Sequence, residues 1–162
     1  MRLTKASILL LSCLAVLCLI SGCSSKEPDF IGYVYHKDKE NKTTLVLGIA
    51  FDKRSTALIR SGVTSLEVGT KVEVYYQTHE LNSPFPLRAP ARLVEIKSSP
   101  EETAMLQTLF AWMKENKAIK YPAVGTITEG DAWSIEVMDL MNEEFTATFV
   151  VSKDLLSIEL QP

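Results

Sequence analysis

Cysteine is scarce in this chain of 162 residues and is confined to its first segment. The three cysteines are Cys13, Cys18 and Cys23. From Ser24 onward the sequence therefore excludes disulfide bonds, cysteine nucleophiles and zinc sites built on thiolates. A fold made from these residues has to gain its stability from a hydrophobic core alone.

Histidine and the motifs of hydrolytic catalysis are scarce as well. The two histidines, His36 and His79, do not stand one helical turn apart, the spacing of a metal-binding pair on a helix. His36 precedes Asp38 and Glu40, but the spacing is not that of a calcium-binding loop, and we interpret this segment as a solvated hairpin turn. The chain has no Gly-x-Ser-x-Gly elbow, no Ser-x-x-Lys motif and no glycine-rich phosphate loop. We therefore predict no catalytic residue, no metal and no cofactor.

The longest apolar run lies at the start of the chain. Basic residues precede it, and the run covers residues 6–20 and leads into Ser21-Gly22-Cys23. It is shorter than the ~20 residues that a membrane-spanning helix needs. A basic start, a short apolar segment and small residues before a cysteine resemble the signal of bacterial lipoproteins. The resemblance implies cleavage after Gly22 and a diacylglycerol joined to the Cys23 sulfur, with or without an acyl group on its amino group.

This resemblance sets the expected organisation and location of the protein. Residues 1–22 are expected to be a cleaved signal peptide and residues 23–29 a lipidated tether. Two acyl chains suffice for stable anchoring. We therefore expect a protein anchored by lipid on the outer face of the bacterial cytoplasmic membrane, or in the outer membrane of a host that has one. The formal net charge of −3, from 17 basic and 20 acidic residues, argues against a nucleic-acid partner.

Strand patterns dominate residues 30–97. Alternating or continuous apolar residues predict strands over residues 30–36, 43–51, 57–59, 72–76 and 91–96. The second of these is apolar on both faces, and its Gly48 predicts a bulge or a close backbone approach. In the fourth, Val72, Val74 and Tyr76 are expected to face a core. About five short strands at this spacing predict a small OB-like β-barrel.

A helix and a second set of strands are expected in residues 98–162. Ser99, Pro100 and Glu102 occupy the positions of a capping box with a first-turn proline. The apolar residues that follow have helical spacing, and strands over 123–128, 133–139 and 144–151 predict a three-stranded antiparallel meander. We expect the amphipathic helix to cover the barrel end or this second sheet, which makes one compact α+β unit. Its apolar stripe consists of Met105, Leu106, Leu109, Phe110 and Met113.

Three short motifs point to a family. Gly32-Tyr33-Val34, the strand entry at residues 66–74 and the proline-containing loop at 83–89 resemble the YobA-like lipoproteins of Gram-positive bacteria, a domain of unknown function. The resemblance covers residues 30–96 and implies a lipoprotein signal and an OB-type barrel, with no catalytic residue. The chain differs from the family pattern at Leu87-Arg88 and from Ser99 onward.

Aromatic and basic residues near the proline-containing loop are the candidates for binding. Tyr75 is expected to point outward from its strand, and Phe85 lies between two prolines. Prolines order such a loop in advance and so lower the entropy lost on binding. Phe85 is therefore either part of a recognition loop or a plug that closes the barrel. With Arg88, these residues form the candidate binding set, whereas Trp112 and Trp133 are expected in the core.

Three functions fit these observations. The first is a non-enzymatic binding module that recognises a cell-wall glycan or another envelope protein. The second is an envelope hydrolase that uses a carboxylate pair, since Glu101-Glu102 and Glu143-Glu144 supply neighbouring acids. The third is a stress or immunity lipoprotein that sequesters a toxin, which predicts an exposed apolar patch near Phe85.

Overall fold

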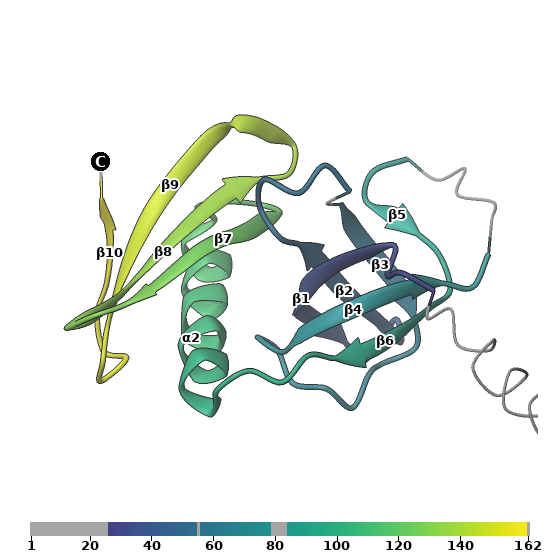
Figure 1. Cartoon of the computed structure of the whole chain (residues 1–162), viewed down its shortest axis with the longest axis horizontal. Coiled ribbons are helices and arrows are strands. Elements are labelled where there is room, and N and C mark those ends of the chain that lie inside the picture. The colour runs from purple at the N-terminus through teal and green to yellow at the C-terminus, as the bar shows by residue number, and fades with distance from the viewer. Residues whose placement is uncertain (1–25, 55, 79–83, 162) are drawn as a thin grey trace, which may run out of the picture.

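Two β-sheets and a helix make up the part of the chain that the computed structural model describes, residues 26–54, 56–78 and 84–161. Six strands form a curled sheet in the order β5-β3-β2-β1-β4-β6, and four form a second sheet in the order β10-β9-β8-β7. Figure 1 shows the curled sheet on one side of the molecule and the second sheet, with α2 beside it, on the other. The predicted α+β class is confirmed.

The curled sheet comes from the first half of the chain. Its neighbouring strands are antiparallel except β3 and β5, which run parallel, with Leu58 opposite Leu87. About five strands were predicted, and the sixth, β5, is only two residues long and lay inside the expected loop. A strand this short has no alternation to detect. The six strands are β1 (Phe30–Asp38), β2 (Thr43–Gly48), β3 (Ala57–Ser61), β4 (Lys71–Tyr76), β5 (Leu87–Arg88) and β6 (Ala91–Glu95).

Two glycines allow β1 and β2 to approach closely. Gly32 lies opposite Gly48, and a Cβ atom added to Gly32 would stand 2.3 Å from the Leu47 carbonyl oxygen. Gly48 takes part in this approach, because its Cα would stand 3.2 Å from the added Cβ, but the position that requires glycine is Gly32, which was not predicted. The predicted strand to residue 51 is too long, because β2 ends at Gly48 and Phe51 turns away with a φ of 62°.

The helix begins where the capping signal predicts. Helix α2 (Pro100–Asn116) follows Ser99, whose hydroxyl accepts a hydrogen bond of 3.0 Å from the Glu102 amide. It ends at Lys117, which adopts the left-handed conformation with a φ of 51°. All five residues of the predicted apolar stripe are buried.

The second sheet has one strand more than the three predicted. The additional strand, β10, pairs with β9 at the sheet edge, with Ile158 opposite Val151. It was missed because it has four residues, three of them exposed, and so shows no amphipathic pattern. Alternation along β9 would place Phe145 on one face with Ala147, Phe149 and Val151, but Phe145 is 42% exposed whereas the other three are buried. The strands are β7 (Pro122–Glu129), β8 (Ala132–Asp139), β9 (Asn142–Ser152) and β10 (Ile158–Gln161).

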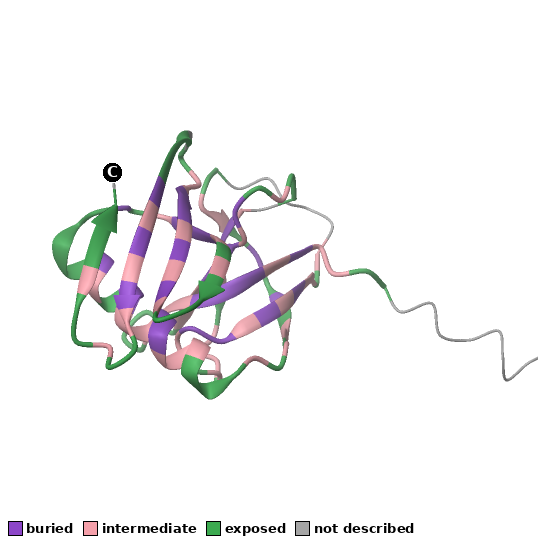
Figure 2. Ribbon diagram, turned by 60° about the vertical axis from the view of Figure 1, so that its left-hand side comes forward, coloured by how far each residue is buried: buried purple, intermediate pink, exposed green. Residues whose placement is uncertain are grey.

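One hydrophobic core joins the two halves of the chain. It contains Tyr33 of β1, the buried stripe of α2 and the inner faces of β8 and β9, including Trp133 and Phe149. A second core, inside the curl of the first sheet, contains Phe30 and Val46. Since successive residues of β1 enter different cores, this strand is buried on both faces. Figure 2 shows the alternation of buried and less buried bands along the strands.

Candidate functional site

The sequence-predicted binding residues lie in three separate environments. The Tyr75 hydroxyl donates a hydrogen bond of 2.7 Å to Glu73, and the Arg92 guanidinium stands 4.4 Å from the ring centroid. These contacts lie on the outer surface of β4 and β6, as predicted for Tyr75. The hydrogen bond to Glu73 is the main cause of a raised Tyr75 pKa. Tyr75 is thus held in a surface cluster and is not brought together with Phe85 or Arg88.

Phe85 rests on the start of the second half of the chain. Its ring contacts Tyr121 edge-to-face, with centroids 5.1 Å apart, and 41% of its surface is exposed. It is absent from the core inside the curled sheet. The interpretation of Phe85 as a plug of the barrel is therefore wrong, because the loop carries the ring outward to the neighbouring sheet.

Arg88 lines a polar hollow on the curled sheet. The hollow has a volume of about 500 Å³ and is bordered by the β1–β2 turn, the faces of β2 and β3, and β5. Arg88 is exposed, and its side chain has no hydrogen-bond or ion-pair partner among the described residues. Asp38 accepts hydrogen bonds of 2.9 and 2.7 Å from Asn41, which lower the Asp38 pKa and hold the turn in place. We call this the Arg88 surface; it consists of Asp38, Asn41, Thr43, Ile59 and Arg88.

A second hollow, which the sequence did not reveal, lies between the curled sheet and the end of α2. Its volume is about 470 Å³, and we call it the His36 pocket. The register of β1 against β2 shifts between Val34 and His36, so Tyr35 is an additional residue in the strand. Such bulges redirect side chains. Both Tyr35 and His36 consequently line the pocket, together with Leu45, Met113 and Ile119.

The rim of the His36 pocket is basic. Lys114, Lys117 and Lys120 complete its lining, and none of the three forms an ion pair with a described residue. The Lys114 amino group lies 3.4 Å from His36 Nδ1. The sequence carries one signal for this arrangement, three lysines at intervals of three residues across the end of a helix. It does not show which part of the sheet they face.

The electrostatic surroundings of His36 favour its neutral form. Partial burial is the largest cause of its lowered pKa, and the positive charge of Lys114 adds to the effect, while Asp38 opposes it. The metal-site interpretation of His36 finds no support, because no group of three His, Cys, Asp or Glu side chains that could hold an ion occurs among the described residues. His79, Cys23 and residues 1–22 lie outside the described residues.

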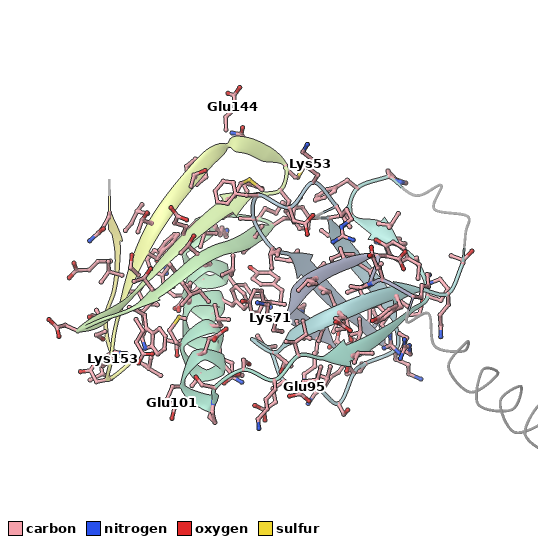
Figure 3. All side chains as sticks on the ribbon, viewed as in Figure 1. Lys53, Lys71, Glu95, Glu101, Glu144 and Lys153 are labelled. Atoms are coloured by element: carbon pink, nitrogen blue, oxygen red, sulfur yellow. The ribbon has the colours of Figure 1, made fainter. Side chains whose placement is uncertain are left out.

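The acids named for a carboxylate pair lie on two different elements, Glu101 and Glu102 in α2 and Glu144 in β9. Figure 3 labels Glu95, Glu101 and Glu144, which lie on β6, α2 and β9 and point away from the body of the molecule. The two carboxyl groups with shifted pKa values, Asp38 and Asp154, are both lowered by hydrogen bonds. A general acid requires the opposite shift.

Comparison of the chain with protein families, curated proteins and solved structures gives no match. In the described residues, no helix has the length and apolar character needed to cross a membrane.

Proposed function

We propose that the chain is a lipid-anchored, non-enzymatic binding module of the bacterial cell envelope. The attachment rests on Ser21-Gly22-Cys23 and the short apolar run before it, which resemble a lipoprotein signal. Diacylation of Cys23 would supply two hydrophobic chains, which is enough for stable anchoring. Residues 24–29 would then hold the folded part close to the membrane surface.

We further propose that the curled sheet is an OB-type barrel, as the resemblance to YobA-like lipoproteins implies. The order of its strands supports this proposal, because β5 pairs with β3 in parallel and β6 pairs with β4 in antiparallel. Only Ala89 and Pro90 separate β5 from β6. One bent segment would thus bridge the two edges of the sheet, as the last strand of an OB barrel does.

The Arg88 surface is the observation that carries the binding proposal. OB barrels bind chain-like ligands on the faces of their second and third strands, between flanking loops. In this chain the corresponding place holds a carboxylate, an amide and an exposed guanidinium around a hollow of about 500 Å³. Sugar hydroxyl groups are recognised by planar polar groups of this kind. A cell-wall glycan is accordingly the ligand class that fits the surface.

The binding test is the melting temperature of the chain from Ser24 onward with soluble wall fragments. A ligand present at one hundred times its Kd adds about 2.7 kcal/mol, which should raise the melting temperature by roughly 5–10 °C at this size. Arg88→Glu should abolish the shift, and Lys53→Glu, which reverses an exposed charge away from the hollow, should retain it. An unchanged melting temperature of the parent chain with every wall fragment would refute glycan binding.

The anchoring test is the Cys23→Ala substitution in the full chain. The protein should move from the membrane to the soluble fraction, and the mass of the attached acyl groups should disappear. Membrane attachment that survives this substitution would show that the signal interpretation is wrong.

A protein partner is the second candidate, because large apolar side chains are exposed near Phe85. Leu140 donates a backbone hydrogen bond to Tyr121, on which Phe85 rests, and the adjacent Met141 is 62% exposed. An exposed apolar patch of this kind is what toxin sequestration requires. Cross-linking in cells should then yield one envelope protein whose recovery falls in a Phe85→Ser, Met141→Ser double variant of unchanged melting temperature.

A further inference from the structure

The His36 pocket differs in chemistry from the Arg88 surface, and the two share no lining residue. Its floor is formed by Leu45, Met113, Ile119 and the ring of Tyr35. None of the lining residues is Asp, Glu, Asn or Gln, so a sugar would find few partners for its hydroxyl groups. A hydrocarbon chain would fit this floor, and the flexible side chain of Met113 can adapt to it.

The positive charge of the rim has no counterpart in the pocket. Lys114, Lys117 and Lys120 line it, and no acidic residue belongs to the lining. Asp38 acts on His36 electrostatically, but its oxygens accept hydrogen bonds from Asn41. Lysines near the C-terminal end of a helix also stabilise the helix dipole. That role fits Lys114 and Lys117, whereas Lys120 follows the helix by four residues and stands 5.4 Å from the centroid of the Tyr121 ring.

Lys117 has a backbone conformation that glycine would adopt at a lower free-energy cost. Its φ of 51° lies in the left-handed region at the end of α2, where a residue with a side chain is strained. The chain nevertheless places a lysine here, at the rim of the pocket. The left-handed conformation ends the helix and, at the same point, places the Lys117 charge at the pocket rim.

We infer that the His36 pocket binds a single-chain anionic amphiphile, with its acyl chain on the apolar floor and its carboxylate or phosphate among the lysines. The volume of about 470 Å³ corresponds to the share of roughly fifteen water molecules in the liquid. It therefore has room for an acyl chain of medium length. The inference rests on the proposed function for its setting, because membranes are where such amphiphiles are released.

The test is photoaffinity labelling of the full chain in its membranes with dodecanoate that carries a diazirine on its chain. Mass spectrometry of the digested protein should place the label on the segment of residues 113–120 or on Tyr35 and its neighbours. Labelling should fall as salt is added, because ions screen the attraction between the head group and the lysines. Dodecanol with the same diazirine should label the pocket about ten-fold less, because it lacks the negative charge of the carboxylate.

Two charge-reversal variants separate the pocket from the general charge of the protein. Lys117→Glu with Lys120→Glu should reduce labelling by dodecanoate about ten-fold, which corresponds to about 1.4 kcal/mol. Lys53→Glu with Lys97→Glu changes the net charge equally at exposed sites outside the pocket and should leave labelling unchanged. Equal melting temperatures of both variants and the parent chain would establish that each is folded.

Each remaining outcome has a defined meaning. Equal labelling by the acid and the alcohol, label spread over the surface, or competition by an acidic peptide but not by dodecanoate would overturn the inference. Stronger competition by a lysophospholipid than by dodecanoate would support it and identify the phosphate head group as the source. If Cys23→Ala stays on the membrane while the pocket is labelled, the anchoring proposal fails and this inference stands. If the chain is anchored through Cys23 but the pocket is not labelled, this inference fails and the anchoring proposal stands.

Discussion

Tyr33 shows how a single side chain links the two halves of the molecule. It belongs to β1, yet its ring lies in the core made by α2 and the second sheet, and 3% of its surface is exposed. Burial of the Tyr33 hydroxyl and, after it, the charge of the Glu102 carboxylate in the first turn of α2 raise the Tyr33 pKa. Glu102 thus acts on a side chain of the curled sheet, while its backbone amide donates the hydrogen bond to the Ser99 hydroxyl that caps the helix.

Stability should fall in alkali because buried tyrosines keep their protons in the folded state. Burial and the charge of Glu102 raise the Tyr33 pKa, and burial raises the pKa of Tyr76 to about 12. Both hydroxyls ionise near pH ~10 in the unfolded chain. The contribution of the protonated hydroxyls to the free energy of unfolding is therefore fully present below about pH 10. It is lost as the pH rises toward the pKa values of the folded state.

The measurement is the melting temperature of the parent chain and of Tyr33→Phe from about pH 8 to pH 11. The variant should lose less stability over this range, because one of the two groups no longer ionises on unfolding. Identical pH slopes for the two proteins would contradict the role of Tyr33.

At the scale of elements, the turn before β4 fits against the helix because Gly69 has no side chain. Gly69 has a φ of +86°, and a Cβ atom there would stand 2.7 Å from the carbonyl oxygen of Thr103 in α2. This backbone contact fixes the distance between the helix start and the curled sheet. The sequence marks residues 66–74 as a strand entry, but it does not show the contact of this segment with the helix.

Gly69→Ala should cost about 2–4 kcal/mol, from the left-handed conformation and from the displacement of the helix. Gly62→Ala is the matched control, because Gly62 has nearly the same φ, +88°, and its nearest atom is the end of the Arg60 side chain at 3.5 Å. It should cost about 1 kcal/mol. Chemical denaturation measures the loss in free energy of unfolding for each variant. Equal losses would show that the helix can move away from residue 69 at little cost.

How well an element could be predicted depends on how local its cause is. The start of α2 follows from Ser99 and Pro100, which act on their own neighbours, and the prediction is confirmed. β5 and β10 are edge strands of two and four residues, and they exist because a partner strand accepts them. No local pattern marks such strands. The His36 pocket is even harder to predict from the sequence, because a strand bulge and the end of a helix that lies far away in the chain form it together.

At the scale of the whole molecule, the core shared by both halves should make unfolding a single event. Leu109 lies fully buried at the centre of the α2 stripe. Leu109→Ala should cost about 2–5 kcal/mol, because it removes buried methyl groups and leaves a cavity. Amide hydrogen exchange should lose protection equally at Val46 in the curled sheet and at Ile135 in β8.

Glu115→Ala, an exposed change on the same helix, is the control and should stay within about 0.5 kcal/mol of the parent chain. If Leu109→Ala weakened β8 but left Val46 protected, the curled sheet would be a domain that unfolds independently.

The bulge at Tyr35 has a consequence for how the protein can vary in length. Because Val34 pairs with Val46 and His36 pairs with Leu45, deletion of Tyr35 would leave a regular strand in the same register and keep His36 opposite Leu45. A substitution at the same place changes one side chain only. Deletion and substitution of Tyr35 should therefore affect the pocket in the same way, because both remove the Tyr35 ring from its lining and leave His36 opposite Leu45, so that β1 can lose one residue here without a change of register.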